Sequence, residues 1–232
     1  MKRIFIFLVL LIVFGGNYSC KTNNKGTSVL SNVSPESQGV SSESIVSFID
    51  ELERGGLNMH SFMLIRNGKV LSECYWPFFN AGKKHRMYSV SKSFTSVAIG
   101  MMIDEGRISL DDKVADFFPE YLPADPNPYI LQATVRHLLM MATFNESNSY
   151  NQYDLDWVAT FFQYPGKQHE PGKFFSYDTA ATVVLCAIIE KLNGKTILEY
   201  MRPVLDEIGI SKDIWCIKTP EGRSWTDRKS VV

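Results

Sequence analysis

The first hundred residues show two patterns of apolar and polar positions. Between residues 41 and 52 the apolar residues recur with a helical period, and serines stand where such a helix would begin. Ser61–Ile65 and Val70–Trp76 are short apolar-rich runs on either side of an Asn-Gly pair. Asn and Gly accept the positive φ angles of a tight turn, so this pattern predicts a β-hairpin.

Helical periodicity dominates the rest of the chain. A helix is predicted to follow Ser89 and to stop at Gly106, with an inward stripe of Phe94, Val97, Ala98, Met101 and Met102. Further helical stretches are predicted up to Phe118, after Thr134, over Ala180–Leu192 and over Lys195–Ile208. Prolines 119, 123, 126 and 128 predict a long loop.

The order of these elements indicates an α+β fold. A two-stranded hairpin is not stable by itself, so more strands must complete its sheet. No strand pattern is evident between Lys92 and Ile208. We therefore predict a helical subdomain beside an antiparallel sheet whose remaining strands belong after the helices.

Composition excludes some function classes. The 232 residues are 45% hydrophobic and 21% charged, with a net charge of −1, which is typical of a globular protein. No basic stripe indicates a nucleic-acid partner. The four histidines lack ligand spacing and no Cys-x-x-Cys occurs, so we predict no metal and no cofactor.

The N-terminus has the pattern of a targeting segment. Two basic residues precede Ile4–Phe14, an apolar run of eleven residues that is too short to span a bilayer. Small residues then lead to Cys20, which resembles a bacterial lipoprotein signal. We predict a signal over residues 1–20, a lipid anchor on Cys20, a flexible tether over 21–34 and a place in the bacterial cell envelope, periplasmic or surface-facing. The alternative is an ordinary secretory signal with an incidental cysteine.

The candidate chemistry begins at Ser89. Lys92 follows three residues later at a predicted helix start, and one helical turn puts both side chains on the same face. A serine hydroxyl becomes a good nucleophile when a neighbouring base takes its proton, and a lysine amine can be that base. The alternative is a polar helix start with a solvated lysine.

Longer motifs favour the catalytic interpretation. Met87–Thr95 followed by Gly106–Val114 resembles the active-site serine region of the β-lactamase and penicillin-binding-protein superfamily, in its class C β-lactamase and esterase-like branch. Thr134–Leu139 and Pro171–Tyr177 match further segments of that branch. The resemblance covers roughly residues 35 to 210 and implies a β-lactamase/DD-peptidase-like fold.

The resemblance also assigns roles. It makes Ser89 the acylated nucleophile, Lys92 its proton partner and Tyr177 the tyrosine of the family's Tyr-x-Asn motif, which shuttles a proton to the leaving group. Thr179 stands where the family has asparagine, as a substrate-binding position. One hydroxyl replaces an amide that both donates and accepts, which weakens the expectation of efficient β-lactam hydrolysis.

A larger departure concerns the end of the chain. The family's third motif is a strand that supplies an oxyanion-hole N–H, and Lys218-Thr219-Pro220 does not fit it because proline cannot donate. We therefore expect a C-terminally truncated domain over residues 35–226. Residues 227–232 back-translate into a common sequencing adapter, so we expect a non-native tail; a genuine short tail is the alternative.

The expected function follows from the resemblance. It implies a cell-envelope serine hydrolase that works through an acyl-enzyme on an ester, a β-lactam or a D-Ala-type peptide, so the substrate is a small molecule or a cell-wall peptide. The alternatives are a non-catalytic penicillin-binding-like envelope protein and an inactive fragment.

Overall fold

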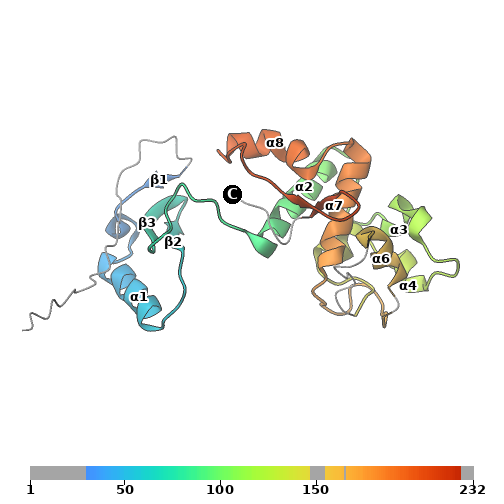
Figure 1. The fold of residues 1–232 in the computed structure, drawn as a ribbon, viewed down its shortest axis with the longest axis horizontal. Helices are drawn as coiled ribbons and strands as arrows, with labels where there is room; N and C mark the ends of the chain where they lie inside the picture. The colour runs from blue at the N-terminus through green and yellow to red at the C-terminus, as the bar shows by residue number, and fades with distance from the viewer. Residues whose placement is uncertain (1–29, 147–154, 165, 226–232) are drawn as a thin grey trace, which may run out of the picture. The chain divides into compact units, whose positions relative to one another are not determined.

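The computed structural model describes residues 30–146, 155–164 and 166–225, and the chain divides into two compact units, Met1–Lys83 and Lys84–Val232 (Figure 1). The predicted signal, Cys20 and the predicted tail lie outside the described residues. The partial domain predicted over residues 35–226 extends over both units. Each unit buries apolar residues of its own, which explains the division.

The first unit contains the predicted helix and hairpin. Helix α1 spans Ser42–Arg54, and the Ser41 hydroxyl caps it by accepting the Ser44 N–H at 3.2 Å. Strands β2 (Ser61–Arg66) and β3 (Lys69–Tyr75) pair antiparallel. The two turn residues between them have φ angles of 51° and 68°, as the Asn-Gly pair predicts.

A third strand corrects the predicted tether. Strand β1 (Ser31–Asn32) pairs parallel with β3, so the sheet order is β1-β3-β2. The Val33 N–H continues this pairing by donating to the Val70 carbonyl at 3.0 Å. The edge of β3 offers backbone partners that a polar sequence pattern does not reveal. The short 3₁₀ helix η1 (Pro35–Gln38) follows.

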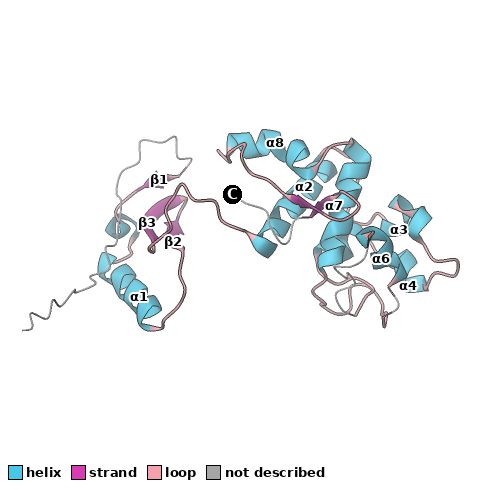
Figure 2. Cartoon of the chain, in the orientation of Figure 1, coloured by secondary structure: helices cyan, strands magenta, loops and turns pink. Residues whose placement is uncertain are grey.

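Helices dominate the second unit (Figure 2). In chain order its elements are η2 (Tyr88–Ser91), α2 (Lys92–Asp104), α3 (Val114–Phe117), η3 (Pro119–Tyr121), α4 (Pro128–Gln132), α5 (Val135–Leu139), α6 (Trp157–Gln163), α7 (Thr179–Asn193), α8 (Ile197–Glu207), β4 (Ile217–Lys218) and β5 (Ser224–Trp225). The predicted α+β class is confirmed. The proline-rich segment, predicted as a loop, contains η3 and α4, because proline fits the first turn of a helix.

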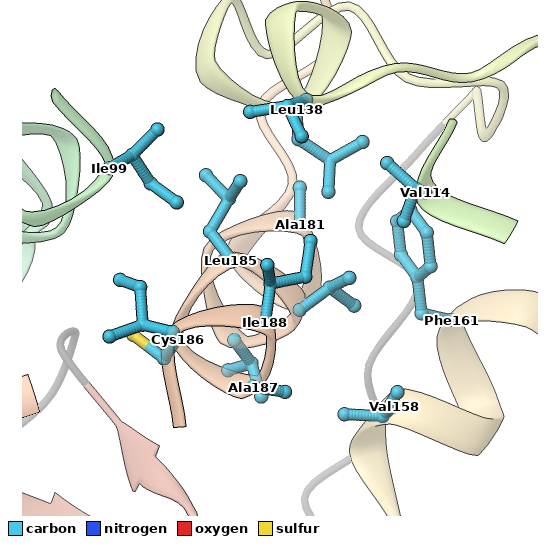
Figure 3. Packing of buried hydrophobic residues seen from close by; sticks show 14 of the residues in the cluster. Ile99, Val114, Leu138, Val158, Phe161, Ala181, Leu185, Cys186, Ala187 and Ile188 are labelled. Atoms are coloured by element: carbon cyan, nitrogen blue, oxygen red, sulfur yellow. The ribbon is translucent and has the colours of Figure 1, made fainter. Parts of the chain in front are cut away.

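Helix α7 is the centre of the second unit. Its sequence is apolar all round, and every residue from 179 to 189 is buried. Figure 3 shows side chains of α7, including Leu185 and Ile188, surrounded by Ile99 of α2, Leu138 of α5 and Phe161 of α6. The helix ends at Gly194, whose φ of 71° suits a left-handed C-cap.

One residue of the predicted α2 stripe is misplaced. The buried face of α2 consists of Thr95, Ala98, Ile99 and Met102. Val97 is 48% exposed within the described residues. At 3.6 residues per turn it lies about 200° around the helix from Ile99, away from the face that packs on α7.

Within the described residues, no helix is both long and apolar enough to cross a membrane.

Candidate active site

Ser89 lies in a tight turn directly before α2. It belongs to η2, and its side chain is exposed. The buried Ser91 hydroxyl donates to the Tyr88 carbonyl at 2.5 Å and so closes the turn. Tyr88 has a φ of 47°, a left-handed conformation that costs a non-glycine residue free energy. Such local strain is common at functional sites, and here it immediately precedes the candidate nucleophile.

The Lys92 amine reaches the candidate nucleophile. Its Nζ donates a hydrogen bond to the Ser89 Oγ at 3.2 Å. The two residues are three apart, across the junction of η2 and α2, so local helical geometry alone produces this contact. A proton on the hydroxyl therefore has an amine within hydrogen-bonding distance.

Tyr177 reaches the same amine from a distant part of the sequence. Lys92 Nζ lies 5.1 Å from the centroid of the Tyr177 ring, a cation–π distance. Tyr177 precedes α7, which packs against α2. A buried contact of 3.5 Å between Thr95 Oγ1 and Cys186 Sγ joins the two helices. The structure thus brings the three candidate catalytic residues together around the Lys92 amine.

The predicted substrate-binding residue is placed differently. Thr179 is the first residue of α7 and is only 4% exposed. Asp178 before it caps the helix by accepting the Ala180 N–H at 2.9 Å. A substrate-binding role for Thr179 stays a prediction. The lipid-anchor residue, Cys20, lies outside the described residues.

Removing the cap next to the site is expected to weaken α7. We expect Asp178→Ala to lower the free energy of unfolding by about 1 kcal/mol, because the Ala180 N–H loses its acceptor inside the protein. Asp178→Asn keeps an acceptor oxygen and is the matched control. Urea unfolding followed by circular dichroism measures both. Equal losses for the two variants would contradict the capping role.

Strand β5 of the second unit is bonded to α7. The Ser224 N–H in β5 donates to the Glu190 carboxylate at 3.0 Å, near the C-terminal end of α7. Glu190 is twelve residues from Asp178, or about 18 Å along the helix. Strand β5 is therefore anchored at the end of α7 that is far from Tyr177.

Sequence reasoning missed two residues that shape the site. Ser91 was read only as part of the motif, although its hydroxyl closes the turn under Ser89. His137 was considered only as a possible metal ligand, although its ring faces Gly172 in the segment leading to Tyr177. A Thr-x-x-His spacing at a helix start is the signal that could have identified it. Among the described residues, no group of three or more His, Cys, Asp or Glu side chains could hold a metal ion.

Known proteins are similar to this chain in sequence. Residues 47–209 match the family model described as Beta-lactamase. The 6-aminohexanoate-dimer hydrolase of Paenarthrobacter ureafaciens is 38% identical over 60 residues, which are 26% of this chain and 15% of that protein.

Solved structures share the fold. The octameric penicillin-binding protein homologue from Pyrococcus abyssi is 23% identical, with a TM-score of 0.57 over 82% of this chain and 53% of its own. The D-amino acid amidase from Ochrobactrum anthropi SV3 is 21% identical, with a TM-score of 0.60 over 75% of this chain and 53% of its own. This chain thus matches about half the length of these structures.

Proposed function

Because the chain belongs to the Beta-lactamase family, we propose that it is a serine hydrolase of the bacterial cell envelope that works through an acyl-enzyme. The Ser89 Oγ attacks a carbonyl carbon while Lys92 takes the hydroxyl proton. The proton passes through the Tyr177 hydroxyl to the leaving oxygen or nitrogen as its bond to carbon breaks. Water then attacks the ester, releases the acid and restores the serine hydroxyl.

The hydrogen bond of 3.2 Å between Lys92 Nζ and Ser89 Oγ carries this proposal. A general base must lie within hydrogen-bonding distance of the proton that it removes, and this pair does. The exposed position of Ser89 supports it further, because a substrate carbonyl needs access to the oxygen. The Ser89 backbone N–H, in the turn before a helix, is a candidate oxyanion donor.

The substrate is proposed as a small ester, β-lactam or D-Ala-type peptide. Two of the similar proteins are named as a hydrolase of a 6-aminohexanoate dimer and as a D-amino acid amidase. Those names favour amide substrates for the proposed activity. A carboxylate on the substrate would find positive charge at the exposed Arg86 in the loop before Ser89.

A second candidate is a non-catalytic envelope protein that binds wall peptides. Thr179 favours it, because threonine stands where the resemblance expects asparagine and its side chain is buried rather than presented to a ligand. Such a protein would be acylated at Ser89 without turning over. An inactive fragment is the third possibility.

Labelling and turnover separate these candidates. The purified full chain is treated with a fluorescent penicillin or a fluorophosphonate, and hydrolysis of a p-nitrophenyl ester is followed in parallel. Labelling with turnover supports the hydrolase, whereas labelling without turnover favours the binding protein. If a sample with helical circular dichroism shows neither, the inactive fragment is the better description.

The proposed membrane anchor has its own test. We expect Cys20→Ala to abolish incorporation of an alkyne-palmitate label in bacterial cells and to move the chain out of the membrane fraction, because the acceptor thiol is gone. Cys216→Ser is the matched control and should keep both label and fractionation. If Cys20→Ala retains the label, the anchor assignment is wrong.

A further inference from the structure

We propose that His137 is a positioning residue: its neutral imidazole, oriented by Thr134, packs against Gly172 and holds the segment that carries Tyr177 beside Lys92. This inference rests on the proposed function, because it concerns how the proton-shuttling tyrosine is placed. It goes beyond the helix-capping role that the position of His137 suggests.

Thr134 fixes which way the imidazole points. The Thr134 N–H donates to His137 Nδ1 at 3.1 Å, and the Thr134 Oγ1 lies 3.2 Å from the same nitrogen. Because Nδ1 accepts a backbone N–H, it carries no proton, and the neutral ring has its proton on Nε2. One edge of the ring is thus tied to the start of α5, and the other edge points away from it.

That other edge meets Gly172. A Cβ on Gly172 would lie 3.1 Å from His137 Nε2 and 3.2 Å from Cδ2, tighter than ordinary van der Waals contact. Gly172 also has a φ of 84°, which side chains rarely adopt. The imidazole therefore packs on bare backbone, at a position where only glycine fits both the conformation and the space.

The backbone after Gly172 is joined to the end of α5. The His137 carbonyl accepts the Ala142 N–H at 2.9 Å, and the Ala142 carbonyl accepts the Gly172 N–H at 2.8 Å. The Ser176 N–H then donates to the Met141 carbonyl at 2.7 Å, one residue before Tyr177. The backbone of Met141 and Ala142 thus bonds the same short segment that the His137 ring faces at Gly172.

Protonation would release this arrangement. An imidazolium carries N–H groups on both nitrogens, so Nδ1 could no longer accept from the Thr134 N–H. Burial, and then the positive charges of Lys113 and Arg136, lower the pKa of His137, whereas Asp111 acts in the opposite direction. The neutral ring is therefore favoured in the folded protein. The segment around Gly172, which faces the His137 ring, contains three further titratable residues, His169, Glu170 and Lys173.

The sign of the pH effect follows. The unfolded chain binds a proton at this histidine near pH 6.5, and the folded chain binds it at lower pH. As the pH falls through about 6.5, the free energy of unfolding decreases, because the unfolded chain binds the proton more readily. Below the folded-state pKa the ring is protonated and loses its bond to Thr134. The segment should thus be held at neutral pH and released in acid.

Hydrogen exchange of the full chain, read by mass spectrometry as protection factors from pH 5 to pH 8, tests the proposal without requiring activity. We expect peptides covering residues 171–177 to lose about tenfold protection toward the acid end. His137→Gln keeps a capping-box acceptor for the Thr134 N–H but lacks the ring. It should show the low protection at every pH, while peptides covering 135–141 stay protected.

Two controls separate this effect from other causes. His169→Gln removes the histidine of the facing segment and should keep the wild-type pH dependence. Gly172→Ala should lower protection strongly, and less so when combined with His137→Ala, because the methyl group then has no ring to meet. Protection at 171–177 that is unchanged in His137→Gln would overturn the proposal.

The pH profile of fluorophosphonate labelling at Ser89 connects the segment to the chemistry. In the wild type we expect labelling to slow as the pH falls. In His137→Gln we expect slow labelling already at pH 7 and no further slowing that depends on this histidine. If exchange changes as expected but the wild-type chain is never labelled, the positioning role stands and the proposed function fails. If labelling is normal in His137→Gln, the positioning role fails and the proposed function stands.

Discussion

Lys92→Ala is expected to slow acylation of Ser89 by about 10²- to 10⁴-fold, the contribution typical of a positioned general base. The amine that lies 3.2 Å from the Ser89 Oγ is removed in this variant. The measurement is the rate constant of fluorophosphonate labelling of the full chain, with Ser89→Ala as the unlabelled limit. Lys92→Arg keeps the positive charge but cannot accept a proton, so it should be nearly as slow as alanine.

Two further variants complete this prediction. Tyr177→Phe keeps a ring beside the Lys92 amine and removes only the hydroxyl. Slower acylation of Ser89 in this variant therefore indicates lost proton transfer rather than lost packing. Ser93→Ala changes another exposed serine of the same motif and should label at the wild-type rate. The roles would be wrong if Lys92→Ala and Tyr177→Phe both labelled as fast as the wild type.

Trp157→Ala is expected to cost about 3–5 kcal/mol of unfolding free energy. Trp157 is 2% exposed at the start of α6 and packs edge to face on Trp225, with ring centroids 4.4 Å apart. Its backbone N–H donates to the Glu221 carboxylate at 3.1 Å, and alanine would keep this donor, so the expected cost comes from the lost indole ring. Because a domain is stable by only about 5–15 kcal/mol, this loss is large.

Urea unfolding followed by far-ultraviolet circular dichroism measures the effect. Trp215 is 43% exposed, and Trp215→Ala is the matched control, with an expected cost well below that of Trp157→Ala. A double-mutant cycle with Trp225→Ala should give a coupling of about 0.5–1.5 kcal/mol for the aromatic pair. A cost for Trp157→Ala no larger than for Trp215→Ala would mean that the segment carrying β4 and β5 is not packed as described.

Local signals predicted most elements correctly. The Asn-Gly turn of the hairpin, the serine cap of α1 and the end of α2 before Gly106 all appear where the pattern placed them. Each of these depends on a few adjacent residues, whose φ preferences and capping hydrogen bonds act without distant partners. The contact between Ser89 and Lys92 is of the same kind.

Other predictions failed because they depended on distant partners. Strand β1 exists because the edge of β3 accepts it, and the polar sequence before Pro35 gives no sign of that. Val97 is apolar but faces away from α7. Which face of α2 is buried depends on how the helix packs in the core, not on the sequence of α2 alone.

By itself, the sequence determined the helices, the hairpin and the pairing of a hydroxyl with an amine one turn apart, because backbone preferences and i, i+3 spacing are short-range. Only the tertiary structure brought Tyr177 to Lys92 and His137 to Gly172. Both contacts depend on the packing of α7 against α2 and α5. That packing is driven by burial of apolar surface, which is non-directional and joins residues far apart in the sequence.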